Sequence, residues 1–170
     1  MTRHDIFSTP LWHIKGASQQ LVEELYQGAY QFKDRYKSNI LSNQGGYQTP
    51  PFSLENFHPQ GIQYIKEVTT EIGKCEIEWW YNINPTGAWN LPHTHPGSDF
   101  ALVWYLTDSD GLLKLLSPFS QRVKTVDRPY YNINAKKGDI IIFPSDIMHF
   151  VMANQRKEDR ICISMNLRLC

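Results

Sequence analysis

The stretch Asn90-Leu91-Pro92-His93-Thr94-His95-Pro96-Gly97-Ser98 carries two histidines separated by one residue. It follows Trp79-Trp80-Tyr81-Asn82-Ile83-Asn84, whose aromatic and β-branched side chains are typical of a strand. Because side chains point to the same face at every second position of a strand, His93 and His95 are expected to project together. Two imidazoles on one face provide half of a metal site.

His149 is the best candidate for a third ligand. It follows Gly138-Asp139-Ile140-Ile141-Ile142-Phe143-Pro144, which reads as a turn, a buried strand and a proline break. In a rolled sheet, strands far apart in sequence become neighbours, so His149 can meet His93 and His95. Three histidines suit zinc, iron, nickel, copper or manganese, and the ligands alone do not choose between them. The alternative is three hydrogen-bonded histidines in a sheet without a metal.

The chain after residue 74 predicts a mostly β fold. Short runs rich in β-branched and aromatic residues are divided by Pro, Gly and Asp turns. The expected strands are 75–84, 87–93, 100–107, 112–116, 129–134, 139–143, 148–154 and 160–168. Eight short strands of this kind indicate a jelly roll, which can hold a metal or small molecule between its sheets.

The first 74 residues predict one short strand and two helices packed on the outside of the jelly roll. The strand falls within 5–14, and an amphipathic helix capped by Ser18 follows it and runs to Tyr36. A second helix starts at Pro59 and ends at Gly73. Residues 42–51 are expected to form an irregular loop. We therefore expect a single domain, 1–170, with 1–74 as N-terminal support and 75–170 as the core that carries the metal site.

Composition lends no support to several classes of partner and favours one location. Seventeen Lys and Arg balance seventeen Asp and Glu, so bulk charge indicates no nucleic acid or membrane partner. No apolar run reaches the length of a membrane span, and the N-terminus leads into no signal core, so a cytoplasmic location is expected. Three scattered cysteines are too few for a disulfide framework.

Several fragments together resemble a known family, the Fe(II)/2-oxoglutarate-dependent oxygenases of bacteria and phages. Each fragment is weak alone, but their order and spacing over nearly the whole chain are fairly specific. The fragments are Ile6-Phe7-Ser8-Thr9-Pro10-Leu11-Trp12, Ser42-Asn43-Gln44-Gly45-Gly46-Tyr47-Gln48, Asn84 through Ser98, Val103-Trp104-Tyr105-Leu106, Gly138 through Ser145, His149 and Arg160-Ile161-Cys162-Ile163-Ser164-Met165-Asn166.

The resemblance implies a double-stranded β-helix, an Fe(II) cofactor and 2-oxoglutarate as cosubstrate. In such enzymes 2-oxoglutarate and O₂ are consumed, succinate and CO₂ are formed, and a bound substrate is hydroxylated. By position, His93 and His149 match the outer histidines of the metal triad. Arg160, eleven residues after His149, matches the arginine that binds the distal carboxylate of 2-oxoglutarate. A guanidinium fork suits a carboxylate.

The chain departs from the wider pattern at two positions. The middle ligand is usually a carboxylate, and this chain has His95, which raises the net charge of the site by one. Cys162 stands where a small hydroxyl residue is common, which leaves Ser164 for a hydroxyl contact. Tyr105 and Asn82 are further candidates for polar contacts to the cosubstrate.

A second resemblance is to cupin motifs. Gly87, His93-Thr94-His95 and Asp99 look like a first cupin motif, and Gly138, Pro144 and His149 look like a second. On this hypothesis the protein binds a metal through three histidines, with Asp99 as a further candidate, and acts as a small-ligand protein or a zinc enzyme without 2-oxoglutarate. Arg160 separates the two hypotheses, because only the oxygenase needs it inside the pocket.

The sequence does not identify the substrate, and it does not decide between a small metabolite, a peptide side chain and a lipid. Loops at the mouth of a rigid barrel usually carry specificity, so residues 44–53 and 117–128 are expected to do so. A homodimer is compatible with the sequence.

Overall fold

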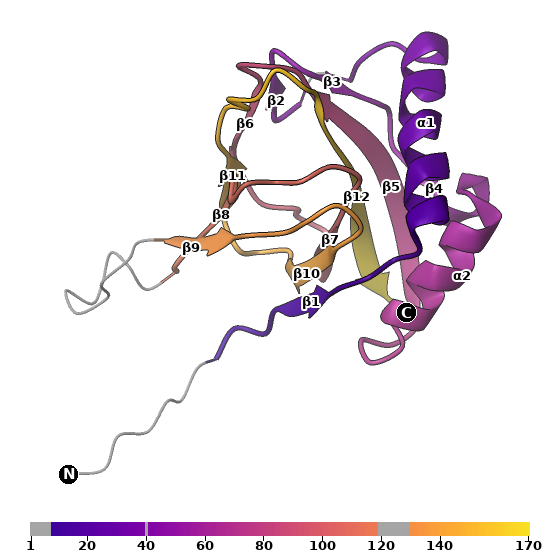
Figure 1. The fold of residues 1–170 in the computed structure, drawn as a ribbon. Coiled ribbons are helices and arrows are strands. Elements are labelled where there is room, and N and C mark those ends of the chain that lie inside the picture. Colours follow the sequence, from indigo (N-terminus) through magenta and orange to yellow (C-terminus); the bar gives the residue numbers. More distant parts are fainter. Residues whose placement is uncertain (1–7, 40, 119–129) are drawn as a thin grey trace.

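Two antiparallel sheets face each other in the computed structural model, which describes residues 8–39, 41–118 and 130–170 (Figure 1). The larger sheet has the order β1-β10-β7-β12-β5-β3, and β4 also pairs with β5; the smaller has the order β2-β6-β11-β8-β9. The strands are β1 Trp12–Ile14, β2 Asn43–Gln44, β3 Tyr47–Gln48, β4 Phe52–Ser53, β5 Cys75–Asn84, β6 Trp89–His93, β7 Phe100–Tyr105, β8 Leu113–Leu116, β9 Tyr130–Ile133, β10 Ile140–Pro144, β11 His149–Val151 and β12 Arg160–Leu169.

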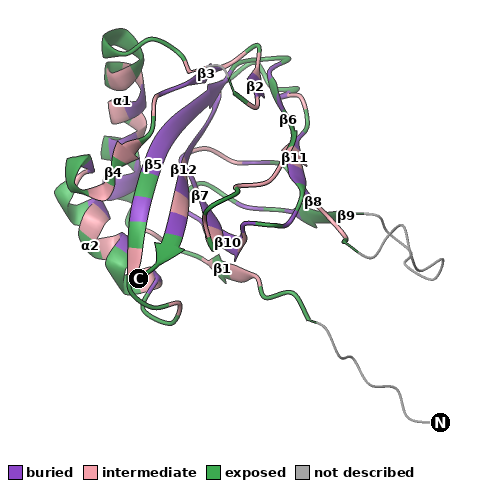
Figure 2. Ribbon diagram, turned by 180° about the vertical axis from the view of Figure 1, so that it is seen from behind, coloured by how far each residue is buried: buried purple, intermediate pink, exposed green. Residues whose placement is uncertain are grey.

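Two helices, α1 Gln19–Arg35 and α2 Pro59–Val68, cover the outer face of the larger sheet (Figures 1 and 2). As predicted, Ser18 caps α1: its Oγ accepts a hydrogen bond from the Leu21 N–H at 3.1 Å. The buried face of α1 consists of Leu21, Val22, Leu25 and Ala29. These side chains pack on the outward-facing residues of the sheet, and the partly buried Tyr26, Tyr30 and Phe32 of α1 pack against the same core.

The long ladder between β5 and β12 separates this core from the site. Alternate residues of β5, such as Trp79, Tyr81 and Ile83, pack under the helices. The residues between them face the smaller sheet, because side chains alternate along a strand. In register, Arg160 lies opposite Asn84, Cys162 opposite Asn82 and Ser164 opposite Trp80. The inner face of this ladder is therefore polar, unlike the outer face.

The structure corrects three boundaries expected from the sequence. Residues 42–51 contain β2 and β3, which pair with β6 and β5 instead of forming an irregular loop. α2 ends at Val68 and not at Gly73. There the Thr69 and Thr70 hydroxyls donate to the carbonyls of Ile65 and Lys66, which competes with continued helix. The N-terminal strand begins at Trp12 among the described residues; residues 5–7 of the predicted strand lie outside them.

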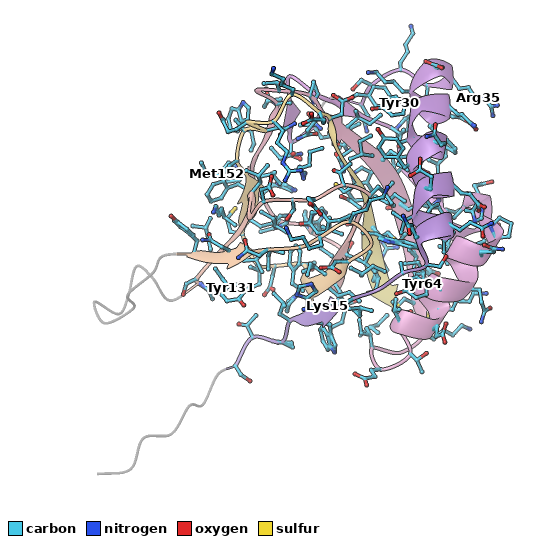
Figure 3. The ribbon with its side chains drawn as sticks, viewed as in Figure 1. Lys15, Tyr30, Arg35, Tyr64, Tyr131 and Met152 are labelled. Carbon is cyan, nitrogen blue, oxygen red and sulfur yellow. The ribbon has the colours of Figure 1, made fainter. Side chains whose placement is uncertain are left out.

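The face of the smaller sheet that points away from the helices is largely exposed. Met152 and Tyr131 lie on this side (Figure 3), and their exposed fractions are 49% and 64%. The predicted strand 129–134 is found as β9, although residue 129 and most of the predicted specificity loop 117–128 lie outside the described residues. No helix in the described part of the chain is both long and apolar enough to cross a membrane.

Candidate metal centre

Three histidines meet at the ends of two paired strands of the smaller sheet. His93 ends β6 and His149 begins β11, and the two are direct partners in the antiparallel ladder. His95 follows in a turn that is held by a 2.9 Å hydrogen bond from its backbone N–H to the Ser145 carbonyl. The ligand atoms of the three side chains lie within 4.8 Å of one another. These are the three residues that the sequence indicated as ligands.

Backbone carbonyls orient two of these imidazoles. The Nδ1 of His93 lies 2.6 Å from the Leu91 carbonyl oxygen, and the Nδ1 of His149 lies 2.9 Å from that of Ile147. A carbonyl can only accept, so each Nδ1 carries the proton and each Nε2 keeps its lone pair. The Nε2 atoms of His95 and His149 lie 3.2 Å apart. Such outer contacts fix the ring and tautomer of metal-binding histidines.

The environment keeps the imidazoles neutral. Burial lowers the pKa of His149 to about 3 and of His95 to about 4, and it also lowers the pKa of His93. The neighbouring imidazoles add to these effects on His149 and His95. A metal ion needs the deprotonated nitrogen, so the ligand form is already present at neutral pH.

A cavity of about 330 Å³ adjoins the histidine cluster. Its wall includes the four residues that the sequence indicated as cosubstrate contacts, namely Arg160, Ser164, Tyr105 and Asn82. These four come from the larger sheet, whereas the histidines come from the smaller sheet or the turn after β6. The structure therefore brings all seven predicted residues to one cavity.

Arg160 is a buried cation without an acidic partner among the residues that the structure describes. Its side chain is 5% exposed, its Nε has no hydrogen-bond partner, and no ion pair joins it to a described residue. Its Nη2 contacts the Cys162 Sγ at 3.8 Å, which does not neutralise the charge. The buried Tyr105 hydroxyl also lacks a partner, and burial raises its pKa, so it stays protonated. Two donors on the cavity wall thus need an acceptor.

Asn82 and Ser164 form a pair on adjacent strands. The Asn82 Nδ2 donates to the Ser164 Oγ at 2.9 Å, which leaves the hydroxyl proton of Ser164 free to donate elsewhere. The Asn82 Oδ1 is buried without a partner. Ser164 and Asn82 therefore act as a unit in which the amide orients the hydroxyl.

These residues fit a divalent metal together with a dicarboxylate. Three neutral imidazole nitrogens suit Fe(II) and other divalent transition metals. A buried guanidinium without an anion is costly, and a carboxylate relieves that cost through charge-assisted hydrogen bonds. The donor set and the orphaned Arg160 and Tyr105 atoms thus match 2-oxoglutarate better than a neutral ligand.

Asp99 does not join the cluster. Its carboxylate accepts a hydrogen bond from the Leu169 N–H of β12 at 2.8 Å, and it is absent from the group of potential ligands among the described residues. Pro96 and Gly97 turn the chain between His95 and Asp99, so the two side chains do not continue one strand face.

Sequence reasoning missed several residues of the wall. Asn166 lies close enough to His95 to raise the pKa of the imidazole, and its Oδ1 is buried without a partner. Gln48 and Asn90 also line the cavity. The alternation along β12 could have indicated Asn166, because it is two residues after Ser164 and so faces the same way. Gln48 lies within the segment 44–53 that was expected to carry specificity, but no pattern singled out the residue itself, since its strand is only two residues long.

A protein-family model described as "Putative 2OG-Fe(II) oxygenase" matches residues 78–166, just over half of the chain. The chain belongs to this family. It is an enzyme, an Fe(II)- and 2-oxoglutarate-dependent oxygenase, and the match confirms the oxygenase resemblance drawn from the sequence. The matched segment of this 2OG-Fe(II) oxygenase runs from β5 to β12 and contains the seven predicted site residues.

Solved structures share the fold of this oxygenase at low sequence identity. A prolyl-4-hydroxylase from Pseudomonas putida is 13% identical with a TM-score of 0.71, and the match covers 96% of this chain and 94% of that chain. HygX from Streptomyces hygroscopicus, determined with nickel and 2-oxoglutarate bound, is 12% identical with a TM-score of 0.68, and the match covers 95% of this chain and 83% of HygX. The viral collagen prolyl hydroxylase of Paramecium Bursaria Chlorella virus-1 is 16% identical with a TM-score of 0.62, and the match covers 94% of this chain and 96% of the viral enzyme. The predicted double-stranded β-helix is therefore confirmed.

Among curated proteins, no sequence matches this oxygenase.

Proposed function

We propose that His93, His95 and His149 hold the Fe(II) of this oxygenase and that Arg160 binds the distal carboxylate of 2-oxoglutarate. The observation that carries the proposal is the buried Arg160 guanidinium, which shares a cavity with the histidine cluster and has no acidic partner among the described residues. When bound, Fe(II) and 2-oxoglutarate supply the activation of O₂ for substrate hydroxylation, with succinate and CO₂ as coproducts.

The chain's own residues then have distinct roles. Arg160 and the protonated Tyr105 hydroxyl donate to one carboxylate, and Ser164, oriented by Asn82, offers a further hydroxyl proton. Asn166 positions His95, because its buried amide oxygen can accept from the ring N–H that faces away from the metal. Apolar wall residues such as Val103, Leu113 and Val151 limit the access of water to the site.

Binding of 2-oxoglutarate to zinc-loaded protein tests this proposal without turnover. Zinc is redox-inert, so calorimetry reports binding alone. We expect Arg160→Gln to weaken 2-oxoglutarate binding at least a hundredfold, since a buried charge-assisted pair is lost. Arg168→Gln is the matched control: Arg168 lies eight residues further along β12, is exposed and contacts Glu76. Equal affinity of wild type and Arg160→Gln would refute the assignment.

Three broader sequence hypotheses remain proposals. We infer a cytoplasmic location, which is consistent with the free thiols of Cys75, Cys162 and Cys170.

We infer one domain over 1–170, with 1–74 as support for the 75–170 core. The packing of α1 and α2 on β5, β7 and β12 supports that inference. A homodimer stays a prediction, for which sedimentation equilibrium is the measurement.

A further inference from the structure

The wall of the cavity nearest β2 and β3 has no role in the proposed metal and cosubstrate sites. It is built by residues from the segment 41–51, namely Leu41, Ser42, Gln48 and Pro51. β3 lies at the edge of the larger sheet and β2 at the edge of the smaller sheet, so this wall is where the space between the sheets ends. A substrate that enters from this edge meets these side chains before it reaches the histidines.

Gln48 is fixed with its side chain toward the cavity. The hydroxyl of its neighbour Tyr47 donates to the Tyr36 carbonyl of the chain at the end of α1, at 2.8 Å, so Tyr47 faces the helices. Side chains alternate along a strand, and Gln48 therefore faces the opposite way. Its backbone is held on both sides, by the Ser38 hydroxyl at 3.2 Å and the Asn39 N–H at 2.8 Å. The residue is 5% exposed and lines the cavity.

The carboxamide of Gln48 is left without a protein partner. No hydrogen bond joins its side chain to another residue in the described part of the chain. Asn82 lies directly opposite in the β3–β5 ladder, so the Cβ atoms of the two residues are about 5 Å apart. The Asn82 Nδ2 already donates to Ser164, whereas its Oδ1 is buried and unpaired. Two neighbouring carboxamides thus present a donor and two acceptors to the cavity.

We propose that Gln48, with the Oδ1 of Asn82, binds an amide group of the substrate, so that this oxygenase acts on a compound with a peptide-type amide. This inference rests on the proposed function. A secondary amide has one N–H and one C=O, which complement the free acceptor of Asn82 and the free donor of Gln48. The unpaired Asn82 Oδ1 needs a donor, which an amide N–H supplies. Glu78, the acidic residue of the cavity wall, lies four residues along β5 from Asn82, about 13 Å away.

Blocked amino acids are the probes for this site. We would titrate N-acetyl amino acid N′-methylamides, one for each side chain, into wild-type protein loaded with Zn(II) and 2-oxoglutarate, and follow binding by ligand-observed NMR. Each probe has two amide N–H groups, so two ester analogues are needed: the methyl ester replaces the C-terminal N–H by an oxygen, and the O-acetyl hydroxy acid analogue replaces the N-terminal one. We expect at least one amide to bind, and one of its two esters to bind at least tenfold more weakly, because the Asn82 acceptor is then unpaired.

The variant Gln48→Leu should weaken the amide at least tenfold. Gln44→Leu, on β2 and outside the cavity wall, is the matched control and should bind the amide as the wild type does. Equal binding of the amide and both of its esters to wild type, unchanged amide binding in Gln48→Leu, or no binding of any amide would each overturn the Gln48 inference. The amide and ester comparison needs no variant, so it holds even if Gln48→Leu folds poorly. If zinc-loaded wild-type protein did not bind 2-oxoglutarate at all, that result would instead contradict the proposed function.

Discussion

The His149 side chain shows how one buried residue can link proton binding to stability. Its exposed fraction is 4%, and burial lowers its pKa from 6.5 to about 3 in the folded chain. The unfolded chain therefore takes up the proton first as the pH falls. The stabilisation from neutral His149 is complete above pH 6.5 and is lost as the pH falls toward 3.

This linkage predicts an acid-sensitive metal-free protein. Between about pH 7.5 and about pH 5, His149 should lower the free energy of unfolding by about 2 kcal/mol. In His149→Asn the side-chain NH₂ can still donate to the Ile147 carbonyl, but the group no longer titrates. Urea unfolding of the metal-free proteins at both pH values measures this. The free energy of unfolding should fall by about 2 kcal/mol less in the variant than in wild type between the two pH values. An equal loss in both proteins would contradict the assigned pKa.

At the residue scale, the three histidines converge as predicted, but not for the reason that the sequence suggested. β6 ends at His93, so His95 does not share a strand face with it; the bond from the His95 N–H to the Ser145 carbonyl holds His95 in the following turn instead. His149 meets His93 because their strands pair, as expected in a rolled sheet. Arg160 was indicated by a resemblance, not by local pattern. Asp99 shows the limit: its spacing matches a cupin motif, but the turn at Pro96 and Gly97 sends its carboxylate to the backbone of β12.

At the scale of elements, α1 depends on one capping side chain. The Ser18 hydroxyl satisfies an N–H that the helix itself cannot satisfy. We expect Ser18→Ala to lower the free energy of unfolding by about 1 kcal/mol, measured by chemical denaturation of the metal-free protein. Ser53→Ala is a suitable control, since Ser53 precedes the 3₁₀ turn Leu54–Asn56 and makes no capping bond there. If Ser53→Ala lowered the free energy of unfolding as much as Ser18→Ala does, the loss of the helix cap would not be the cause of the destabilisation.

The longer elements were predictable and the shortest were not. β5, β7, β10 and β12 are long enough for aromatic and β-branched runs to stand out between turn residues. β2 and β3 contain two residues each and exist because they pair with β6 and β5, which are far away in sequence. A local pattern rich in Gly and Asn cannot reveal such pairing. For the same reason the sequence indicated only the segment 44–53 as a source of specificity and did not single out Gln48 within it.

At the scale of the whole molecule, the proposed site joins the two sheets. The histidines belong to the smaller sheet or the turn after β6, and Arg160, Tyr105, Ser164 and Asn82 belong to the larger sheet. A metal chelated by 2-oxoglutarate would therefore tie one sheet to the other. Sequence could place each residue on a strand, but which sheet faces which follows from pairings between distant strands.

This arrangement predicts coupled stabilisation by the two ligands. Zn(II) and 2-oxoglutarate together should raise the melting temperature by more than the sum of their separate effects, because ligands that bind the folded state stabilise it by mass action. Differential scanning calorimetry measures this directly. In Arg160→Gln, the increment from 2-oxoglutarate should disappear while that from zinc remains. An equal shift by 2-oxoglutarate with and without metal would refute the coupling.

The most direct test of the account is anaerobic titration of metal-free protein with Fe(II) and then 2-oxoglutarate, followed by visible spectroscopy. The account predicts the metal-to-ligand charge-transfer band of an iron-chelated 2-oxo acid. The band should be absent in His149→Ala, weaker in Arg160→Gln, and absent when succinate, which lacks the 2-oxo group, replaces 2-oxoglutarate. Wild-type protein that binds Fe(II) but develops no band with 2-oxoglutarate would contradict the account.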